Sequence, residues 1–236
     1  MKSWRYQGAR DRDLKRRERR SSTRRETGLV PAFFSLCWWL YVRLYLKLFH
    51  RLEVLGRENL PREPGFIMVS NHSSHLDTLA LAAALPLRWN GHVFPVAAGD
   101  TFFNRPETAW FAANFLNALP LWRSRASAHA LAELRERVMV AEEVLILFPE
   151  GTRSRDGKMG SFKSGIGRLV AGSPVQIVPA KIQGAFEAYA ADRKVPRPHS
   201  ITLRLGPALS FPDLSDDREG WNAIARDLEA AVELLD

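Results

Sequence analysis

The sequence is poor in cysteine and has no long hydrophobic run. Its 236 residues include one cysteine, Cys37, which excludes an internal disulfide and fits a reducing compartment. We expect the Cys37 thiol to be buried as a small apolar side chain. The uncharged run from Leu29 to Val42 spans only fourteen residues, whereas a transmembrane helix needs about 20. It also lacks the small-residue cleavage site of a signal peptide. The sequence therefore predicts neither a disulfide scaffold nor a membrane-spanning helix.

A nucleophile elbow is missing as well. The motif Gly-x-Ser-x-Gly, which places the catalytic serine of α/β hydrolases on a strained turn, occurs nowhere in the chain. A serine hydrolase or thioesterase that uses Ser73, Ser74 or another serine stays an alternative hypothesis.

The charge is distributed unevenly along the chain, whose formal net charge is +8. Residues 1–28 carry eleven Lys or Arg against four Asp or Glu, whereas residues 212–236 carry two against eight. Residues 1–28 also lack apolar periodicity, so we expect a basic arm that is disordered or loosely helical. Anionic lipid attracts such an arm by about 1 kcal/mol per basic residue near the surface, and a solvated tail is the alternative. We expect no nucleic-acid partner, because the charge is not gathered on a recognisable reading element.

Residues 29–51 have the pattern of an amphipathic helix that lies in a membrane interface. Basic side chains recur at helical spacing in its second half, and large apolar side chains occupy much of the remainder. Tryptophan and tyrosine favour the level of the lipid headgroups. Packing of this helix on a protein core is the alternative, and both can hold together. The basic positions are Arg43, Lys47, His50 and Arg51, and the aromatic positions are Trp38, Trp39, Tyr41 and Tyr45.

Residues 52–236 alternate between strand and helix patterns and are long enough for one sizeable α/β core. Apolar runs of strand length are followed by stretches of helical period. This order is typical of an α/β fold in which helices flank a largely parallel central sheet. We expect strands at 65–70, 92–98, 144–148, 175–182 and 200–205, and helices at 76–85, 110–116, 127–142, 162–171 and 221–235.

A histidine and an aspartate, His72 and Asp77, follow the first of these strands at a spacing of five positions. Imidazole titrates near neutral pH, and a nearby carboxylate can fix its tautomer and stabilise its charged form. Residues five apart do not face together on one continuous helix. The two side chains therefore meet only if the chain turns between them, as at a strand end that enters a helix capped by Ser73 or Ser74. A hydrogen-bonded surface turn is the alternative.

A second polar loop follows the predicted strand at 144–148. A proline ends the strand and Gly151 permits a positive φ, which leaves Glu150, Thr152 and Arg153 at the strand's end. The planar guanidinium of an arginine suits a phosphate or a carboxylate. Because ligands bind outside the carboxyl ends of parallel strands, the two loops can face one cleft. A tight turn with solvated side chains is the alternative.

Together the two loops resemble motifs of the glycerolipid acyltransferase family, whose type member is the bacterial 1-acyl-glycerol-3-phosphate acyltransferase. The first motif runs from Asn71-His72 to Asp77, and the second is Phe148-Pro149-Glu150-Gly151-Thr152-Arg153-Ser154. Two further blocks, residues 119–123 and 177–184, are similar to the family's remaining blocks. The resemblance covers residues 52 to 211.

The resemblance implies an O-acyltransferase of phospholipid biosynthesis that joins a fatty acyl thioester to a glycerolipid-like hydroxyl, with 1-acyl-glycerol-3-phosphate as the first choice of acceptor. His72 is the implied general base and Asp77 the residue that orients it, without an acyl-enzyme. Acyl-CoA or acyl-carrier protein is the donor, and no further cofactor is implied. The other partner is an anionic membrane, and the enzyme is expected to be peripheral or monotopic at its cytoplasmic face. The implied acceptor-binding residues are Arg123, Glu150, Gly151, Thr152 and Arg153.

Three features differ from the family pattern. Asn117 stands where the family usually has glycine, and residues 96–103 lack a lysine that many members carry. We expect both places to lie near the acceptor's head group. The additional histidine, His75, is expected to be a packing or surface residue, and a metal site formed with it lacks a further clear ligand pair. A non-catalytic lipid-binding or membrane-tethering protein is the remaining alternative, in which replacing His72 would leave activity in cells unchanged.

Overall fold

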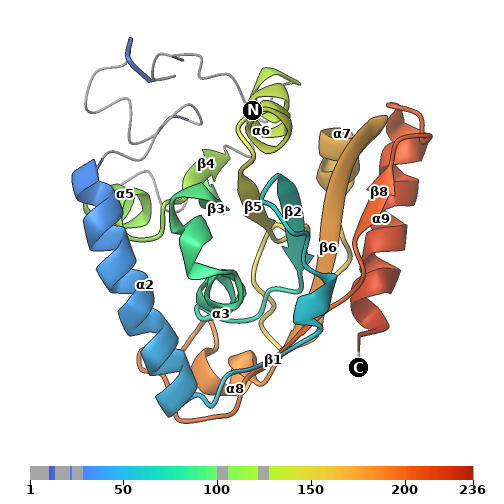
Figure 1. Ribbon diagram of the computed structural model, residues 1–236. Helices are drawn as coiled ribbons and strands as arrows, with labels where there is room; N and C mark the ends of the chain where they lie inside the picture. The colour runs from blue at the N-terminus through green and yellow to red at the C-terminus, as the bar shows by residue number, and fades with distance from the viewer. Residues whose placement is uncertain (1–10, 14–21, 23–28, 100–105, 122–127, 236) are drawn as a thin grey trace.

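The computed structural model describes residues 11–13, 22, 29–99, 106–121 and 128–235. Most of the predicted basic arm lies outside these residues, and so does Arg123. Within the described residues, eight strands form one sheet in the order β1-β7-β6-β2-β5-β3-β4, and β8 pairs with β6 (Figure 1). The strands are β1 (Glu53–Leu55), β2 (Phe66–Ser70), β3 (Val93–Ala98), β4 (Leu119–Leu121), β5 (Val144–Leu147), β6 (Ser173–Gln183), β7 (Thr202–Leu205) and β8 (Leu209–Phe211).

The central strands are parallel, which confirms the predicted sheet type. β2 lies between β5 and β6 and pairs with both in parallel register, and its five residues are all buried. A strand buried on both faces needs a continuous apolar run, which is what β2 and β5 have. Among the described strands, the antiparallel pairs are those of β7 and β8 with β6.

Helices cover both faces of the sheet. Alternate residues of β2 point to opposite faces, so Met68 belongs to the cluster beneath α2 and α3, whereas Ile67 belongs to the cluster beneath α6, α7 and α9. Figure 1 shows α2 and α9 at opposite sides of the molecule with the sheet between them. The helices are α2 (Leu29–Phe49), α3 (Asp77–Ala84), α5 (Pro106–Asn114), α6 (Ala128–Met139), α7 (Gly165–Val170), α8 (Ala185–Tyr189) and α9 (Arg218–Glu233), with 3₁₀ turns η1 (Arg57–Asn59) and η2 (Leu87–His92).

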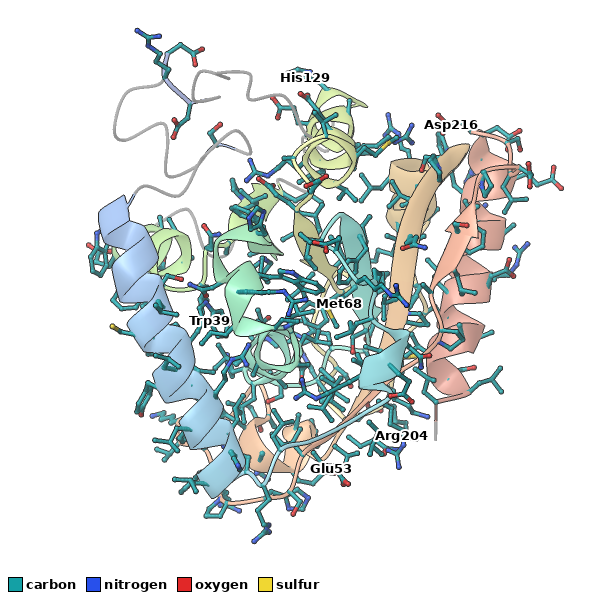
Figure 2. All side chains as sticks on the ribbon, in the orientation of Figure 1. Trp39, Glu53, Met68, His129, Arg204 and Asp216 are labelled. Carbon is teal, nitrogen blue, oxygen red and sulfur yellow. The ribbon has the colours of Figure 1, made fainter. Side chains whose placement is uncertain are left out.

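Helix α2 packs one apolar face on the protein and exposes another. Trp39, Val42 and Leu46 are buried against α3 and η2, and Figure 2 shows Trp39 on the inner side of the helix. The prediction that this helix packs on the protein core is therefore confirmed for this face. The opposite face consists of the exposed side chains Leu36, Leu40, Tyr41, Leu44, Leu48 and Phe49.

Three details of the N-terminal segment differ from the predictions. The Cys37 thiol is exposed, since its position on α2 faces away from the core. The Arg43 guanidinium donates to the carbonyl of Leu85, and burial lowers its pKa. His50 is buried just after the end of the helix, where its ring contacts the Tyr45 hydroxyl at 3.0 Å. Arg43 and His50 are therefore not part of a solvated polar face.

Within the described chain, no helix has the length and hydropathy needed to cross a membrane.

Several short elements were not predicted, and some boundaries moved. The edge strand β4 contains Pro120, a residue that sheets accept at their edges because it lacks an N–H group. Helix α5 begins at Pro106, a favoured first helical residue, and it ends before Asn117. Helix α7 begins at Gly165 rather than at 162. Before it, the N–H of Phe162 donates to a Glu229 carboxylate oxygen at 2.6 Å, and the N–H of Lys163 donates to the carbonyl of Pro149 at 3.0 Å.

Candidate active site

Asn71 fixes the point where the chain leaves β2. Its side-chain oxygen accepts from the N–H of Ile182 at 2.8 Å, and its amide group donates to the Ile182 carbonyl at 2.9 Å. Both bonds are buried and join the carboxyl end of β2 to β6. The start of the loop that follows β2 is therefore anchored to β6.

His72 and Asp77 meet across the turn that the sequence spacing required. Nδ1 of His72 lies 2.9 Å from Oδ2 of Asp77, whose side chain is fully buried. Asp77 is the first residue of α3, and the same oxygen accepts the N–H groups of Ser73 and Ser74 at 2.7 Å each. Neither serine is the N-cap residue, which is Leu76 and has no side-chain cap bond. The Ser74 hydroxyl nevertheless accepts the N–H of Leu76 at 3.1 Å just before α3, and it donates to the carbonyl of Tyr189 at 2.7 Å.

The His72 ring is held on its face as well as at Nδ1. It stacks on Phe148 with ring centroids 3.9 Å apart and planes 15° from parallel. Its side chain is 20% exposed. Because a carboxylate can only accept, Nδ1 carries the proton toward Asp77, which leaves Nε2 for an incoming hydroxyl. The arrangement is that of an oriented general base.

Glu150 connects the second motif to the backbone of the first. One carboxylate oxygen accepts the N–H of His72 at 2.7 Å, and the other accepts the N–H of Gly160 at 3.0 Å. Burial raises the pKa of this carboxyl, while the two backbone N–H groups act in the opposite direction. In addition, the N–H of Ser154 donates to the carbonyl of His72 at 2.7 Å. The two motifs are thus joined through their main chains.

A cavity of about 660 Å³ opens beside His72. Gly151, Thr152 and Arg153 line it together with His72, as predicted for residues of one cleft. Its remaining wall is mainly apolar and comes from helices and strands on either side of the loops. That wall includes Trp38, Leu79, Val96, Phe111, Leu116, Leu121, Leu147 and Phe148.

Arg153 is a charged side chain on the wall of this cavity. Its guanidinium contacts the ring nitrogens of His75, whose ring also lies 4.8 Å from that of Tyr189. Burial, followed by the charge of Arg153, lowers the pKa of His75, so that His75 is neutral at pH 7. His75 therefore packs against an arginine, in agreement with the packing role expected for it. In the part of the chain that is described, no cluster of three metal-ligating side chains occurs.

Asn117 stands where the family usually has glycine, and its backbone conformation explains why asparagine is accepted there. Its φ is +54°, a left-handed value that asparagine adopts more readily than most residues other than glycine. Its side chain is buried and donates to the carbonyl of Val93 at 3.2 Å. Asn117 is not among the residues that line the cavity. Asparagine thus suits the left-handed turn at this position. Its neighbours Leu116 and Ala118 line the cavity, and the expectation that position 117 lies near the acceptor's head group stays a prediction.

Sequence reasoning did not predict that three aromatic residues belong to the site, and it expected one of them, Trp38, at the level of the lipid headgroups. Phe148 stands directly before the proline of the second motif, where its place at a strand end was the available signal. Trp38 and Tyr189 reach the cavity from α2 and α8. No motif marks these two residues, because only the tertiary packing brings their helices to the loops.

Comparisons with known proteins agree with the motifs. An acyltransferase family model matches residues 51–183, more than half of the chain, so the chain belongs to the acyltransferase family. It is 32% identical over 149 residues to the chloroplastic 1-acyl-sn-glycerol-3-phosphate acyltransferase LPAT1 of Arabidopsis thaliana, covering 62% of this chain and 39% of that protein. It is 26% identical over 170 residues to 1-acyl-sn-glycerol-3-phosphate acyltransferase alpha of Mus musculus, covering 71% of this chain and 58% of that protein. The chain thus spans less than two thirds of either relative.

The fold has a counterpart among solved structures. The crystal structure of the 1-acyl-sn-glycerophosphate acyltransferase PlsC from Thermotoga maritima matches with a TM-score of 0.62 and 25% identity. The match covers 83% of this chain and 77% of that chain. The predicted fold class, an α/β fold with a mostly parallel sheet flanked by helices, is therefore confirmed.

Proposed function

We propose that the protein transfers a fatty acyl group from an acyl thioester to the free hydroxyl of 1-acyl-glycerol-3-phosphate. The observation that carries this proposal is the 2.9 Å contact of His72 with the buried Asp77 at a largely apolar cavity that also contains Arg153. An apolar wall suits an acyl chain, and a guanidinium suits a phosphate. The names of the relatives support the same reaction.

The chemistry follows from the position of the imidazole. The acceptor's hydroxyl oxygen attacks the thioester carbonyl while Nε2 of His72 takes its proton, and Asp77 stabilises the imidazolium that forms. Collapse of the tetrahedral intermediate breaks the carbon–sulfur bond, and the thiolate leaves with the proton from His72. An ester and a free thiol are the products. The acceptor itself is the nucleophile, so no acyl-enzyme forms.

Both substrates have a proposed place in the site. Arg153, with the neighbouring Gly151 and Thr152, holds the acceptor's phosphate end, and Arg123, which lies outside the described residues, is proposed to assist. The acyl chain occupies the apolar part of the cavity. Acyl-CoA and acyl-carrier protein present the same thioester, so either donor serves this mechanism, and no further cofactor is needed.

The protein is proposed to work at the cytoplasmic face of an anionic membrane, as a peripheral or monotopic enzyme. The support is the outer face of α2, where Leu40, Leu44 and Leu48 are exposed beside Tyr41. Apolar and aromatic side chains of this kind enter the boundary between headgroups and acyl chains. The basic arm, residues 1–28, adds attraction to anionic lipid.

The proposal is tested with purified protein, labelled acyl-CoA or acyl-carrier protein, and a panel of lysolipids, with products identified by mass. We expect transfer to 1-acyl-glycerol-3-phosphate, and we expect His72→Ala to lower kcat by about 10²–10⁴-fold or more with its unfolding temperature preserved. Rapid hydrolysis of the donor without acceptor would instead indicate a thioesterase. Unchanged transfer by His72→Ala would contradict the proposed base.

A further inference from the structure

One loop holds His72 by three separate contacts. The imidazole ring of His72 stacks on Phe148 with ring centroids 3.9 Å apart. The N–H of His72 donates to the Glu150 carboxylate at 2.7 Å, and the carbonyl of His72 accepts the N–H of Ser154 at 2.7 Å. Phe148, Glu150 and Ser154 all belong to the loop after β5. This loop therefore does more than line the cavity, because it also determines where the imidazole stands.

Glu150 differs from its neighbours in where its side chain goes. Gly151, Thr152 and Arg153 line the cavity, whereas Glu150 does not. Glu150 is only 6% exposed, and each of its two carboxylate oxygens accepts a backbone N–H, one from His72 and one from Gly160. Because its side chain is buried and is not part of the cavity wall, Glu150 is not placed to contact a phosphate or a hydroxyl bound there.

We infer that Glu150 is a positioning residue, whose carboxylate links the main chain of His72 to that of Gly160 and thereby holds the general base in place for catalysis. This inference rests on the acyl transfer proposed above, and it replaces the acceptor-binding role predicted for Glu150. Misplacing a catalytic group by about 1 Å can cost about 10²-fold in rate. A change at Glu150 therefore acts on kcat, while a residue that binds the acceptor acts on its KM.

The geometry requires a carboxylate rather than an amide. Two N–H donors approach two oxygens, and both oxygens of an ionised carboxylate accept. Glutamine has one accepting oxygen, so its NH₂ group would face the other donor. Glu150→Gln thus breaks one of the two links, and Glu150→Ala breaks both.

The first experiment measures kcat and KM for 1-acyl-glycerol-3-phosphate in these two variants. We expect kcat to fall about 10-fold in Glu150→Gln and about 100-fold in Glu150→Ala, with KM within about twofold of the wild type. In NMR spectra, the amide proton of His72 should move upfield in Glu150→Ala, because it loses its carboxylate acceptor. This shift reports the contact independently of the reaction.

Glu229→Ala is the matched control, because it breaks one link just as Glu150→Gln does, whereas a glutamine oxygen at residue 229 would still accept the single N–H of Phe162. The Glu229 carboxylate on α9 accepts the N–H of Phe162 at 2.6 Å, so it makes the same kind of bond in the same segment but away from the cavity. We expect this variant to lose thermal stability to a similar extent as Glu150→Gln and to keep its kcat. An equal loss of kcat in both would mean that Glu150 only stabilises the fold, and it would overturn the inference.

Gly160→Ala tests the other end of the link. A Cβ at residue 160 would lie 3.1 Å from Oε2 of Glu150, the oxygen that accepts the N–H of Gly160, so the carboxylate has to shift. Gly160 does not line the cavity. We expect a lower kcat and an unchanged KM for the acceptor.

Two results overturn the inference. One is a raised KM at normal kcat in Glu150→Gln, which would place Glu150 on the acceptor, and the other is normal kinetics in both Glu150→Ala and Gly160→Ala. If the wild type transfers acyl groups to no lysolipid, the proposed function fails and the catalytic claim fails with it. In that case the His72 amide shift still shows whether the contact exists.

Discussion

At the scale of single residues, the groups that contact the ring of His72 differ from the group proposed to bind the acceptor. Two residues contact the His72 ring and orient it. Oδ2 of Asp77 lies 2.9 Å from Nδ1 of His72, and the ring of Phe148 stacks on the imidazole with centroids 3.9 Å apart. Arg153 lies on the same loop as Phe148, and its guanidinium contacts His75 at the wall of the cavity. Variants of these residues should therefore affect different kinetic constants.

Replacing Arg153 with alanine should raise the KM for 1-acyl-glycerol-3-phosphate by about 10- to 100-fold, the usual range for losing a hydrogen bond to a charged group. The value of kcat at saturation should change little, because the contacts of His72 with Asp77 and Phe148 remain. The measurement is steady-state kinetics with varied acceptor. Monoacylglycerol, which has no phosphate, is the control acceptor, and its KM should not respond. An unchanged KM for the phosphorylated acceptor would remove Arg153 from the phosphate site.

At the scale of elements, α2 is both part of the core and an exposed apolar surface. Its inner face packs on α3 and η2, so it cannot leave the protein without exposing Trp39, Val42 and Leu46. Its outer face has large side chains that are exposed to solvent, such as Leu44 at 56% and Leu48 at 70%. The two faces of one helix can thus be tested separately.

Leu44→Gln/Leu48→Gln should weaken binding to anionic vesicles without lowering thermal stability, because burying an exposed leucine side chain contributes about 1.5–3 kcal/mol. Leu46→Ala, on the inner face of the same helix, is the matched control. It should cost about 2–5 kcal/mol of folding stability, as expected for a fully buried leucine. Vesicle co-sedimentation and thermal unfolding measure the two effects. Normal vesicle binding by the double variant would exclude the outer face of α2 as the membrane contact.

At the scale of the whole molecule, His50 connects the end of α2 to the segment before β7. It is buried, its Nδ1 donates to the carbonyl of His199 at 3.2 Å, and the N–H of Ile201 donates to the carbonyl of His50 at 3.0 Å. Burial is the largest cause that lowers the pKa of His50, and the charge of His199 adds to it, while the bond to the His199 carbonyl acts in the opposite direction. The folded protein therefore favours neutral His50.

This predicts that the protein loses stability as the pH falls below the ordinary histidine pKa of about 6.5. The folded-state pKa of His50 is lowered, so in this window the unfolded chain binds more protons, and the free energy of unfolding decreases with decreasing pH. His50→Phe keeps the ring contacts with Tyr45 and Phe49 and removes the titrating group. We expect a weaker dependence of Tm on pH between 5 and 7 in this variant, measured by calorimetry. An identical dependence would assign the effect to other groups, such as His75, whose pKa is also lowered by burial.

How far the fold could be predicted depends on the length of each pattern. β2, β5 and β6 have apolar runs that need no partner to be recognised, and the amphipathic period of α9 is equally clear. β4, β8 and α8 contain only three to five residues each. Such short segments have no period of their own, and pairing or packing with distant parts of the chain makes them strands or a helix.

The sequence by itself determined the α/β class and the family, because these depend on the order of apolar runs and on residue types at fixed spacings. It also indicated that His72 and Asp77 meet if the chain turns between them, and the structure shows that turn. The tertiary structure decided which groups Glu150 contacts, why Asn117 is accepted, and which face of α2 stays exposed. These properties depend on backbone N–H groups, on φ angles and on the packing of distant segments. Side-chain identity along a chain does not encode such relations directly, since they arise when separate elements meet.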